Sequence, residues 1–252
     1  MTLKQRIAAL ALAGFVTLAA SAAQASAVYT FNVDTSSLPA GTQGYIDLQF
    51  SGSLATGPGA FNQLGTATVS NFQSVGGFFT QANPYTANDF PGGNVTGNVS
   101  GILPNAVTFD VNGDGAINEY THSFQFGSSF SFQLTLAGQG LDAPSCPNTG
   151  GSDCSLPGFT LDLINTTGTA FLLTGDPNGA TGLEWTLGQV NFNTDGTTSP
   201  VIYPGPGGGA SVLTISPVTA VPEPSAWALM LLGLGALGAG LRRRKAMLGV
   251  AA

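Results

Sequence analysis

Apolar and polar side chains alternate one by one in several segments of this sequence, and this period of two constrains the fold more than any other feature. Residues 45–50 read Tyr-Ile-Asp-Leu-Gln-Phe, and residues 129–136 read Ser-Phe-Ser-Phe-Gln-Leu-Thr-Leu. Segments 159–163, 183–187 and 213–215 follow the same pattern. Because successive side chains of a β-strand point to opposite faces, each segment is predicted to be a strand with one apolar face and one solvated polar face.

Turn signals separate these segments, and helical periodicity is missing between residues 28 and 221. The dipeptides that favour turns are Asn112-Gly113, Asp114-Gly115, Asn178-Gly179 and Asp195-Gly196. Glycine and proline number 36 and 15 in 252 residues, and both are unfavourable inside helices. We therefore predict an all-β domain of about ten strands over residues 28–216, an antiparallel two-sheet sandwich whose connections could be those of a jelly roll.

The positive charges are confined to the two ends of the chain. The six basic residues are Lys4, Arg6, Arg242, Arg243, Arg244 and Lys245, and all thirteen acidic residues lie between Arg6 and Arg242. A domain without lysine or arginine cannot neutralise phosphates, so nucleic-acid binding is excluded. Its electrostatic field is expected to repel anionic polymers and to attract cations.

Residues 1–27 have the three parts of a secretory signal peptide, with an N-terminal signal helix. Two positive charges come first, an apolar stretch over residues 7–20 follows, and small residues close the segment. The apolar stretch is shorter than the ~20 residues of a spanning helix, which favours cleavage over a retained anchor. We predict cleavage by signal peptidase between Ala27 and Val28, with Ser26 as the alternative first residue.

The C-terminal end has the layout of a membrane anchor. Residues 217–221 are predicted to be a linker, and residues 226–241 form an uncharged stretch that would span about 24 Å as a transmembrane helix. This is short for a hydrocarbon core of about 30 Å, so flanking side chains must snorkel or the bilayer must thin. Basic residues stay on the cytoplasmic side. The domain is thus expected on the other side, and residues 246–252 are expected to form a cytoplasmic tail.

The C-terminal segment resembles a known sorting domain. Pro222, Glu223 and Pro224, the apolar stretch after them, and the basic cluster Arg242, Arg243, Arg244 and Lys245 are together similar to the PEP-CTERM sorting domain, over residues 222–245. Such domains occur at the C-termini of exported proteins in Gram-negative bacteria that make extracellular polysaccharide. The resemblance implies processing by an exosortase, a membrane-embedded cysteine transpeptidase-like enzyme, which would recognise the Pro-Glu-Pro tripeptide.

We accordingly expect an exported, non-enzymatic protein. Its precursor would be anchored in the inner membrane with a periplasmic domain, and the product would reach the cell surface or extracellular matrix. Signal peptidase and an exosortase are the expected processing partners, with extracellular polysaccharide as a further partner. An alternative is a calcium-assisted module that binds neutral glycans through exposed aromatic side chains. The candidates for stacking on sugars are Tyr29, Tyr45, Tyr85, Trp185 and Tyr203.

Cys146 and Cys154 are the two cysteines of the chain. Outside the reducing cytoplasm, a disulfide between them is favoured over a reactive thiol. Closing a loop of this length would stabilise the fold by about 2.5 kcal/mol through the entropy of the unfolded chain.

Residues 110–118 match the first nine positions of a calcium-binding loop. The candidate ligands are Asp110, Asn112, Asp114 and Asn118. Position twelve is Thr121 instead of a bidentate glutamate, and predicted strands flank the loop where helices are usual. A hairpin turn without tightly bound metal is therefore favoured over a calcium site. No other cofactor is predicted.

His122 alternates with aromatic residues, so it is predicted to be a buried, hydrogen-bonded core residue. A catalytic histidine needs a nucleophile and an orienting acid within reach, and the sequence has no Gly-x-Ser-x-Gly motif. Glu119 and Glu184 could form the carboxyl pair of a glycoside hydrolase, but such a pair without arginine or lysine nearby would be unusual. We therefore expect no catalytic residue.

Overall fold

The computed structural model describes residues 26–51, 65–85, 90–91, 97–111, 117–138, 141, 157–175, 186–193, 195, 197–218 and 235. All of them except Gly235 belong to the unit Ala25–Val218. Within these ranges no helix is long and apolar enough to cross a bilayer. The predicted apolar stretch 7–20 lies outside the described residues, and so does 226–241 apart from Gly235.

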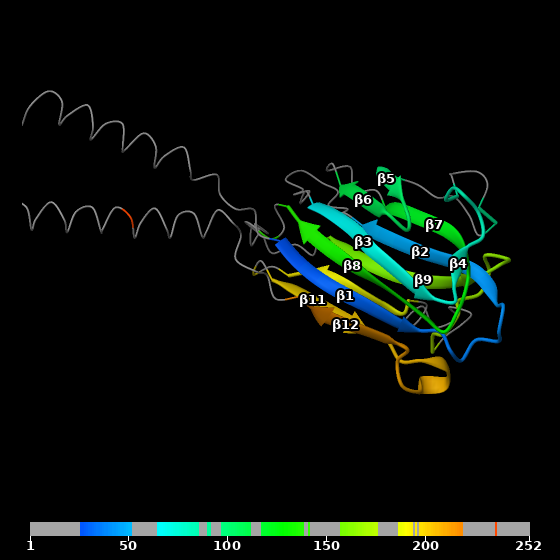
Figure 1. Cartoon of the computed structure of the whole chain (residues 1–252). Helices are drawn as coiled ribbons and strands as arrows, with labels where there is room; N and C mark the ends of the chain where they lie inside the picture. Colours follow the sequence, from blue (N-terminus) through cyan, green and yellow to red (C-terminus); the bar gives the residue numbers. More distant parts are fainter. Residues whose placement is uncertain are drawn as a thin grey trace, which may run out of the picture. The chain divides into compact units, whose positions relative to one another are not determined.

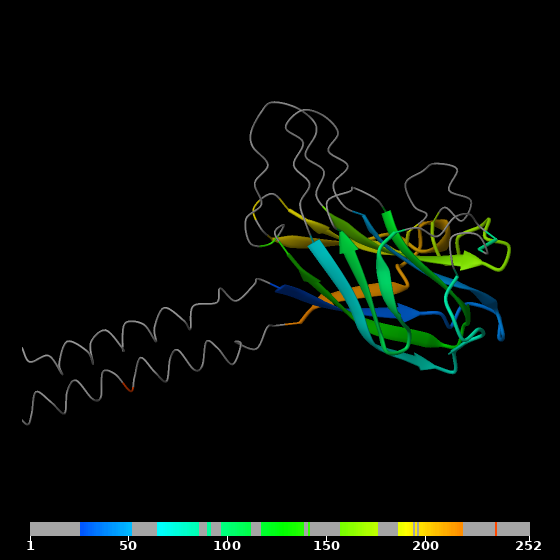
Figure 2. The ribbon, with the colours of Figure 1, turned by 90° about the horizontal axis from the view of Figure 1, so that it is seen from above.

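The described residues form two six-stranded antiparallel sheets (Figures 1 and 2). Sheet A has the order β12 (Leu213–Pro217), β1 (Ser26–Asp34), β8 (Ser129–Ala137), β3 (Gly65–Val75), β6 (Ala106–Val111), β5 (Val99–Ile102). Sheet B has the order β11 (Thr198–Ile202), β10 (Gly188–Phe192), β9 (Gly158–Asn165), β2 (Gln43–Ser51), β7 (Ile117–Gln125), β4 (Phe78–Phe79). A short 3-10 turn, η1 (Pro206–Gly208), lies between β11 and β12. The predictions of an all-β fold and of two antiparallel sheets are confirmed.

The strand pairs are nested. β1 pairs with β8 in sheet A, β2 with β7 in sheet B, and β3 with β6 in sheet A. This nesting is the connectivity of a jelly roll. β5 departs from it, because it pairs with β6 in sheet A instead of joining β4 in sheet B. β9, β10 and β11 extend sheet B beyond β2, and β12 pairs with the outer edge of β1.

Large apolar side chains from both sheets fill the space between them. The ring of Phe31 in β1 stacks on Phe132 in β8, with centroids 4.8 Å apart, and meets Phe159 of β9 edge-on at 5.8 Å. The largest fully buried side chains are Phe31, Phe50, Phe109, Phe124, Phe130, Phe132, Phe159, Ile46, Leu48, Leu134, Leu136 and Leu161. The alternating sequence places these residues on the inner faces, where removing them from water stabilises the sandwich.

One predicted connection is wrong. The hairpin expected around residues 110–118 does not form, because β6 lies in sheet A, β7 lies in sheet B, and the two strands do not pair. Residues 112–116, which are outside the described residues, therefore link one sheet to the other.

The first and last strands lie side by side and run antiparallel, with Tyr29 opposite Pro217. The backbone N–H of Val218 donates to the carbonyl oxygen of Val28 at 2.8 Å. The chain therefore enters and leaves the sandwich at the same end of sheet A. β1 begins at Ser26, so cleavage after Ala27 would fall inside this strand, whereas the alternative start at Ser26 would keep the strand whole.

Candidate functional site

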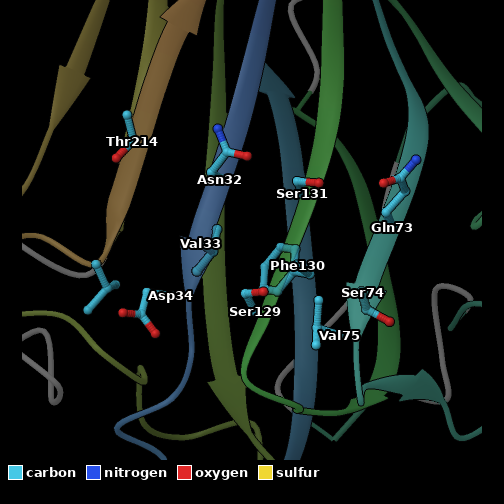
Figure 3. Close-up of a pocket in the computed structure, with 11 residues that line it drawn as sticks. Asn32, Val33, Asp34, Gln73, Ser74, Val75, Ser129, Phe130, Ser131 and Thr214 are labelled. Atoms are coloured by element: carbon cyan, nitrogen blue, oxygen red, sulfur yellow. The ribbon is translucent and has the colours of Figure 1, made fainter.

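A pocket of about 320 Å³ opens on the outer face of sheet A, toward the end of β1 that lies away from Val28 (Figure 3). Four neighbouring strands contribute to it. The lining residues are Asn32, Val33 and Asp34 of β1, Gln73, Ser74 and Val75 of β3, Ser129, Phe130 and Ser131 of β8, Thr214 of β12, and Val212 before it. This volume is at the lower end of the range of small-molecule sites, ~300–1,000 Å³.

The strand register places four polar residues of the pocket in one row. Thr214 lies opposite Asn32, Asn32 opposite Ser131, and Ser131 opposite Gln73. Neighbouring strands are about 4.8 Å apart, so the row runs across the sheet in small steps. In the part of the chain that the structure describes, the side chains of Asn32, Gln73 and Ser131 form no hydrogen bond. Their donors and acceptors are therefore available to a ligand.

A bulge in β3 turns Gln73 and Val75 toward the pocket. The register between β3 and β8 shifts just before Gln73, and Asn71 has a positive φ of 53°. Val69 is buried before the shift, and Phe72 is buried after it, so the inward positions change from odd to even numbers. A regular strand would point residues 73 and 75 toward the core. The bulge therefore assembles this side of the pocket, as bulges near sites often do.

Asp34 is the one charged residue among the lining residues. The backbone N–H of Ser36 donates to Asp34 Oδ1 at 2.9 Å, and the hydrogen bonds from Ser36 lower the pKa of Asp34. The carboxylate is thus ionised at neutral pH. Val75 is 63% exposed and forms an apolar wall. The pocket combines uncharged donors and acceptors, one carboxylate and an apolar contact.

Three carboxyl groups gather on the opposite side of the sandwich, on the outer face of sheet B. Asp47 of β2 lies opposite Thr121 of β7 and opposite Asp162 of β9. Glu119 lies two residues before Thr121 on the same face of β7. Asp47 is 1% exposed and Asp162 is 8% exposed. The prediction of a solvated polar face is therefore wrong for the centre of sheet B.

Hydrogen bonds hold the Asp47 carboxyl in place. Thr121 Oγ1 donates to Asp47 Oδ1 at 2.9 Å, and Gln49 Nε2 donates to Asp47 Oδ2 at 2.8 Å. Thr121 Oγ1 also lies 3.4 Å from Glu119 Oε1. Asp162 Oδ1 is buried and has no hydrogen-bond partner in the described part of the chain. Both carboxylate oxygens of Asp47 thus accept a hydrogen bond, whereas Asp162 Oδ1 accepts none.

Burial raises the pKa of all three carboxyl groups. The pKa of Asp47 rises to about 6 through burial, and that of Glu119 rises to about 7 through burial and the neighbouring charge of Asp47. Burial and the charge of Asp47 raise the pKa of Asp162 well above its ordinary value. No lysine or arginine between Arg6 and Arg242 supplies a counter-charge. The cluster therefore retains protons at neutral pH, because burial and a neighbouring negative charge both disfavour the ionised form of a carboxyl group.

The described residues contain no group of three His, Cys, Asp or Glu side chains arranged to hold a metal ion. Asp47 and Asp162 are buried, whereas Glu119 is partly buried. The protonation of this cluster therefore affects the stability of the fold.

The prediction for His122 is confirmed, since its side chain is 1% exposed. Its Nε2 donates to the carbonyl oxygen of Gln81 at 3.1 Å, and its Nδ1 accepts the Tyr120 hydroxyl at 2.9 Å. The Tyr120 hydroxyl in turn accepts the backbone N–H of Leu103 at 3.0 Å. Burial lowers the pKa of His122, so the ring is neutral and both of its nitrogens are engaged.

Several predicted site residues lie outside the described residues and stay predictions. They are Pro222, Glu223, Pro224, Arg242, Arg243, Arg244, Lys245, Cys146, Cys154, Asn112, Asp114, Glu184 and Trp185. The two described members of the calcium loop are separated in the sheets: Asp110 lies at the end of β6 opposite Thr66, and Asn118 lies in β7. The Asn118 amide accepts the backbone N–H of Asn98 and donates to the Phe50 carbonyl at 3.4 Å. This side chain thus ties neighbouring segments together.

The prediction of exposed aromatic side chains is wrong for Tyr29 and Tyr45, which are buried. The hydroxyl of Tyr29 lies 2.6 Å from Thr198 Oγ1, and that of Tyr45 donates to the Thr166 carbonyl at 3.0 Å. Tyr85 meets Tyr45 edge-on, with an angle of 88° between the rings. These tyrosines therefore do not form a flat platform for sugars.

Sequence reasoning missed the pocket, although one signal for it was present. Ala67 and Val69 keep the period of two, and the next inward residue is Phe72, three positions on. This break in spacing indicates a bulge at Asn71. The residues that share the row with Gln73 come from β8, β1 and β12. These strands are distant in the sequence, so no local pattern predicts that they become neighbours of Gln73.

The comparison with protein families matches the PEP-CTERM protein-sorting motif over residues 220–245. The resemblance of the C-terminal segment is thus confirmed, and the chain carries this sorting motif. The motif supports an exported protein with a C-terminal membrane-anchored sorting signal, and it implies processing by an exosortase-type system. The comparisons with curated proteins and with solved structures give no match.

Proposed function

We propose that this chain is a non-enzymatic protein of the cell surface or extracellular matrix. It is exported through its signal peptide, held in the inner membrane with the β-sandwich in the periplasm, and released when an exosortase acts near Pro222, Glu223 and Pro224. The observation that carries this proposal is the sorting motif at residues 220–245.

The design of the domain supports a role outside the cytoplasm. Both ends of the sandwich emerge at one end of sheet A, where Val28 and Val218 are hydrogen-bonded. An N-terminal signal and a C-terminal anchor can therefore be attached and removed without breaking the core. The absence of lysine and arginine from residues 7–241 suits a protein that remains soluble among neutral polymers.

Mass spectrometry of both termini of the native protein tests this function. In cells with an active exosortase, we expect a mature start at Ser26 or Val28 and loss of Arg242 to Ala252. In a Glu223→Ala variant, or in cells without the exosortase, the C-terminal segment should stay attached. A Val218→Ala variant, with its change outside the motif, is the matched control and should be processed normally. Surface material that retains Arg242 to Ala252 would contradict the proposal.

A further inference from the structure

We propose that the pocket on the outer face of sheet A binds a sugar unit of a neutral polysaccharide. The inference rests on the proposed function in one respect, namely that export brings the domain among extracellular polymers. The chemistry of the pocket is an independent argument, and it is drawn from the residues that line it.

The polar groups of the pocket suit hydroxyl-rich ligands. Asn32 and Gln73 each offer an amide donor and an amide acceptor, and Ser131 offers a hydroxyl that can do both. These three side chains form no hydrogen bond to any described residue, so a ligand does not have to displace an internal partner. A sugar hydroxyl can both donate and accept hydrogen bonds, and this row supplies partners of both kinds.

The apolar part of the pocket suits the C–H faces of a sugar ring. Val75, the last residue of β3, is 63% exposed. Val75 lines the pocket on the β3 side, and the partly buried Val212 lines it on the β12 side, at the other end of the polar row. Binding pockets commonly combine apolar walls with a few placed polar groups. A ligand with both hydroxyl groups and C–H surfaces fits this combination better than a purely polar ion.

Charge selects the class of polysaccharide. Asp34 is the only charged lining residue, and its pKa is lowered, so it accepts hydrogen bonds from sugar hydroxyls but repels carboxylates and sulfates. No lysine or arginine of residues 7–241 can offset it. The pocket is therefore expected to reject uronic-acid and sulfated polymers and to accept uncharged ones.

The position of the pocket leaves room for a polymer. Asn32 and Asp34 are four and six residues along β1 from Val28, where the chain ends of the domain meet. At ~3.3 Å per residue this is roughly 13–20 Å along the strand. The exposed side chains of Asn32, Asp34 and Gln73 border the pocket, so a chain can lie across β12, β1, β8 and β3.

Calorimetric titration of the full-length chain in detergent tests the proposal. The probes are three soluble neutral polysaccharides, a glucan, a mannan and a galactan, with alginate as the anionic comparison. We expect at least one neutral polysaccharide to bind and alginate not to bind. The Asn32→Ala/Gln73→Ala double variant should weaken binding about tenfold or more, as expected for the loss of two or more hydrogen bonds.

Two further variants keep the test decisive. Thr66→Ala/Thr135→Ala is the matched control, because both residues lie on the same face of sheet A away from the pocket, and it should bind as the natural chain does. Ser131→Trp fills the pocket without removing Asn32 or Gln73, and it should abolish binding with an unchanged melting temperature. The proposal is overturned if no neutral polysaccharide binds, if both pocket variants bind normally, or if alginate binds equally well. The state of the two termini, measured on the same preparation, separates such a failure from a failure of the sorting function.

Discussion

The polar side chains on the outer faces of the two sheets differ in their exposure to solvent and in their hydrogen bonding. On sheet A, Asn32, Gln73 and Ser131 stay accessible and form no internal hydrogen bonds. On sheet B, Asp47 and Asp162 are buried, and Asp47 is held by hydrogen bonds from neighbouring strands. The same alternating pattern thus produces one face with accessible polar side chains and one face with buried carboxyl groups.

The largest expected effect is a loss of stability with rising pH that arises from sheet B. A carboxyl with a higher pKa in the folded state binds its proton more tightly there, so the folded state is favoured at low pH. The rise in the pKa of Asp47 from 3.8 to about 6 corresponds to roughly 3 kcal/mol, lost between about pH 4 and pH 7. Denaturant unfolding at a series of pH values measures this loss.

Asp47→Asn should reduce that pH dependence, because the amide does not ionise, while Glu119 and Asp162 still contribute to it. Asp34→Asn is the matched control on sheet A. The Asp34 pKa is lowered in the folded state, so its contribution has the opposite sign and this variant should leave the loss between pH 4 and pH 7 in place. A natural chain that becomes more stable from pH 4 to pH 7 would contradict the account of sheet B.

The next effect concerns the hydroxyl that supports Asp47. Thr121→Val keeps the shape of the side chain but removes the donor to Asp47 Oδ1. We expect a loss of about 1–3 kcal/mol at pH 8, where the carboxyl is ionised, and a smaller loss at pH 4. Thr160→Val, on the outer face of β9, is the control and should change stability by less than about 0.5 kcal/mol. Equal losses at both pH values would argue against a charged Asp47.

Substitutions at Asn71, in the β3 bulge of sheet A, are expected to change the free energy of unfolding by a smaller amount. Asn71 has a φ of 53°, which β-branched residues adopt at a cost of about 1–2 kcal/mol. Asn71→Val should therefore be less stable than Asn71→Gly by about this amount. Both variants lose the hydrogen bond to Gln133 Oε1, so the difference between them isolates the backbone conformation. Equal stabilities in urea unfolding would show that the bulge does not require this φ.

The smallest effect is expected for the pocket side chains themselves. Asn32→Ala/Gln73→Ala should change the free energy of unfolding by less than about 0.5 kcal/mol, because neither side chain has an internal partner to lose. Thermal melting of the full-length chain measures this. A loss of several kcal/mol would mean that the polar row on sheet A supports the fold and would contradict this prediction.

Much of the fold follows from the sequence. Alternation predicts the segments that form β2, β8, β9 and β12, and the aromatic neighbours of His122 predict its burial. These features can be predicted from neighbouring residues in the sequence, because successive side chains of a strand point to opposite faces. The alternating segment 183–187 is not confirmed as a strand, because its described residues Thr186 and Leu187 precede β10 and belong to no strand.

The two outer faces could not be predicted in the same way. Asp47 and Asp162 are 115 residues apart in the chain and become neighbours only through the pairing of β2 with β9. Alternation indicates that Asp47 points outward, but it does not indicate that this outward position is buried. The pocket likewise depends on long-range pairing, which brings Gln73 opposite Ser131 only after the bulge.

Hydrogen–deuterium exchange of the full-length chain, with and without the neutral polysaccharide that binds it best, tests the contrast between the two faces most directly. The account predicts slower exchange at the pocket ends of β1, β3, β8 and β12, and unchanged exchange in β2, β7 and β9. Protection confined to β2, β7 and β9, or no protection in either sheet, would contradict it.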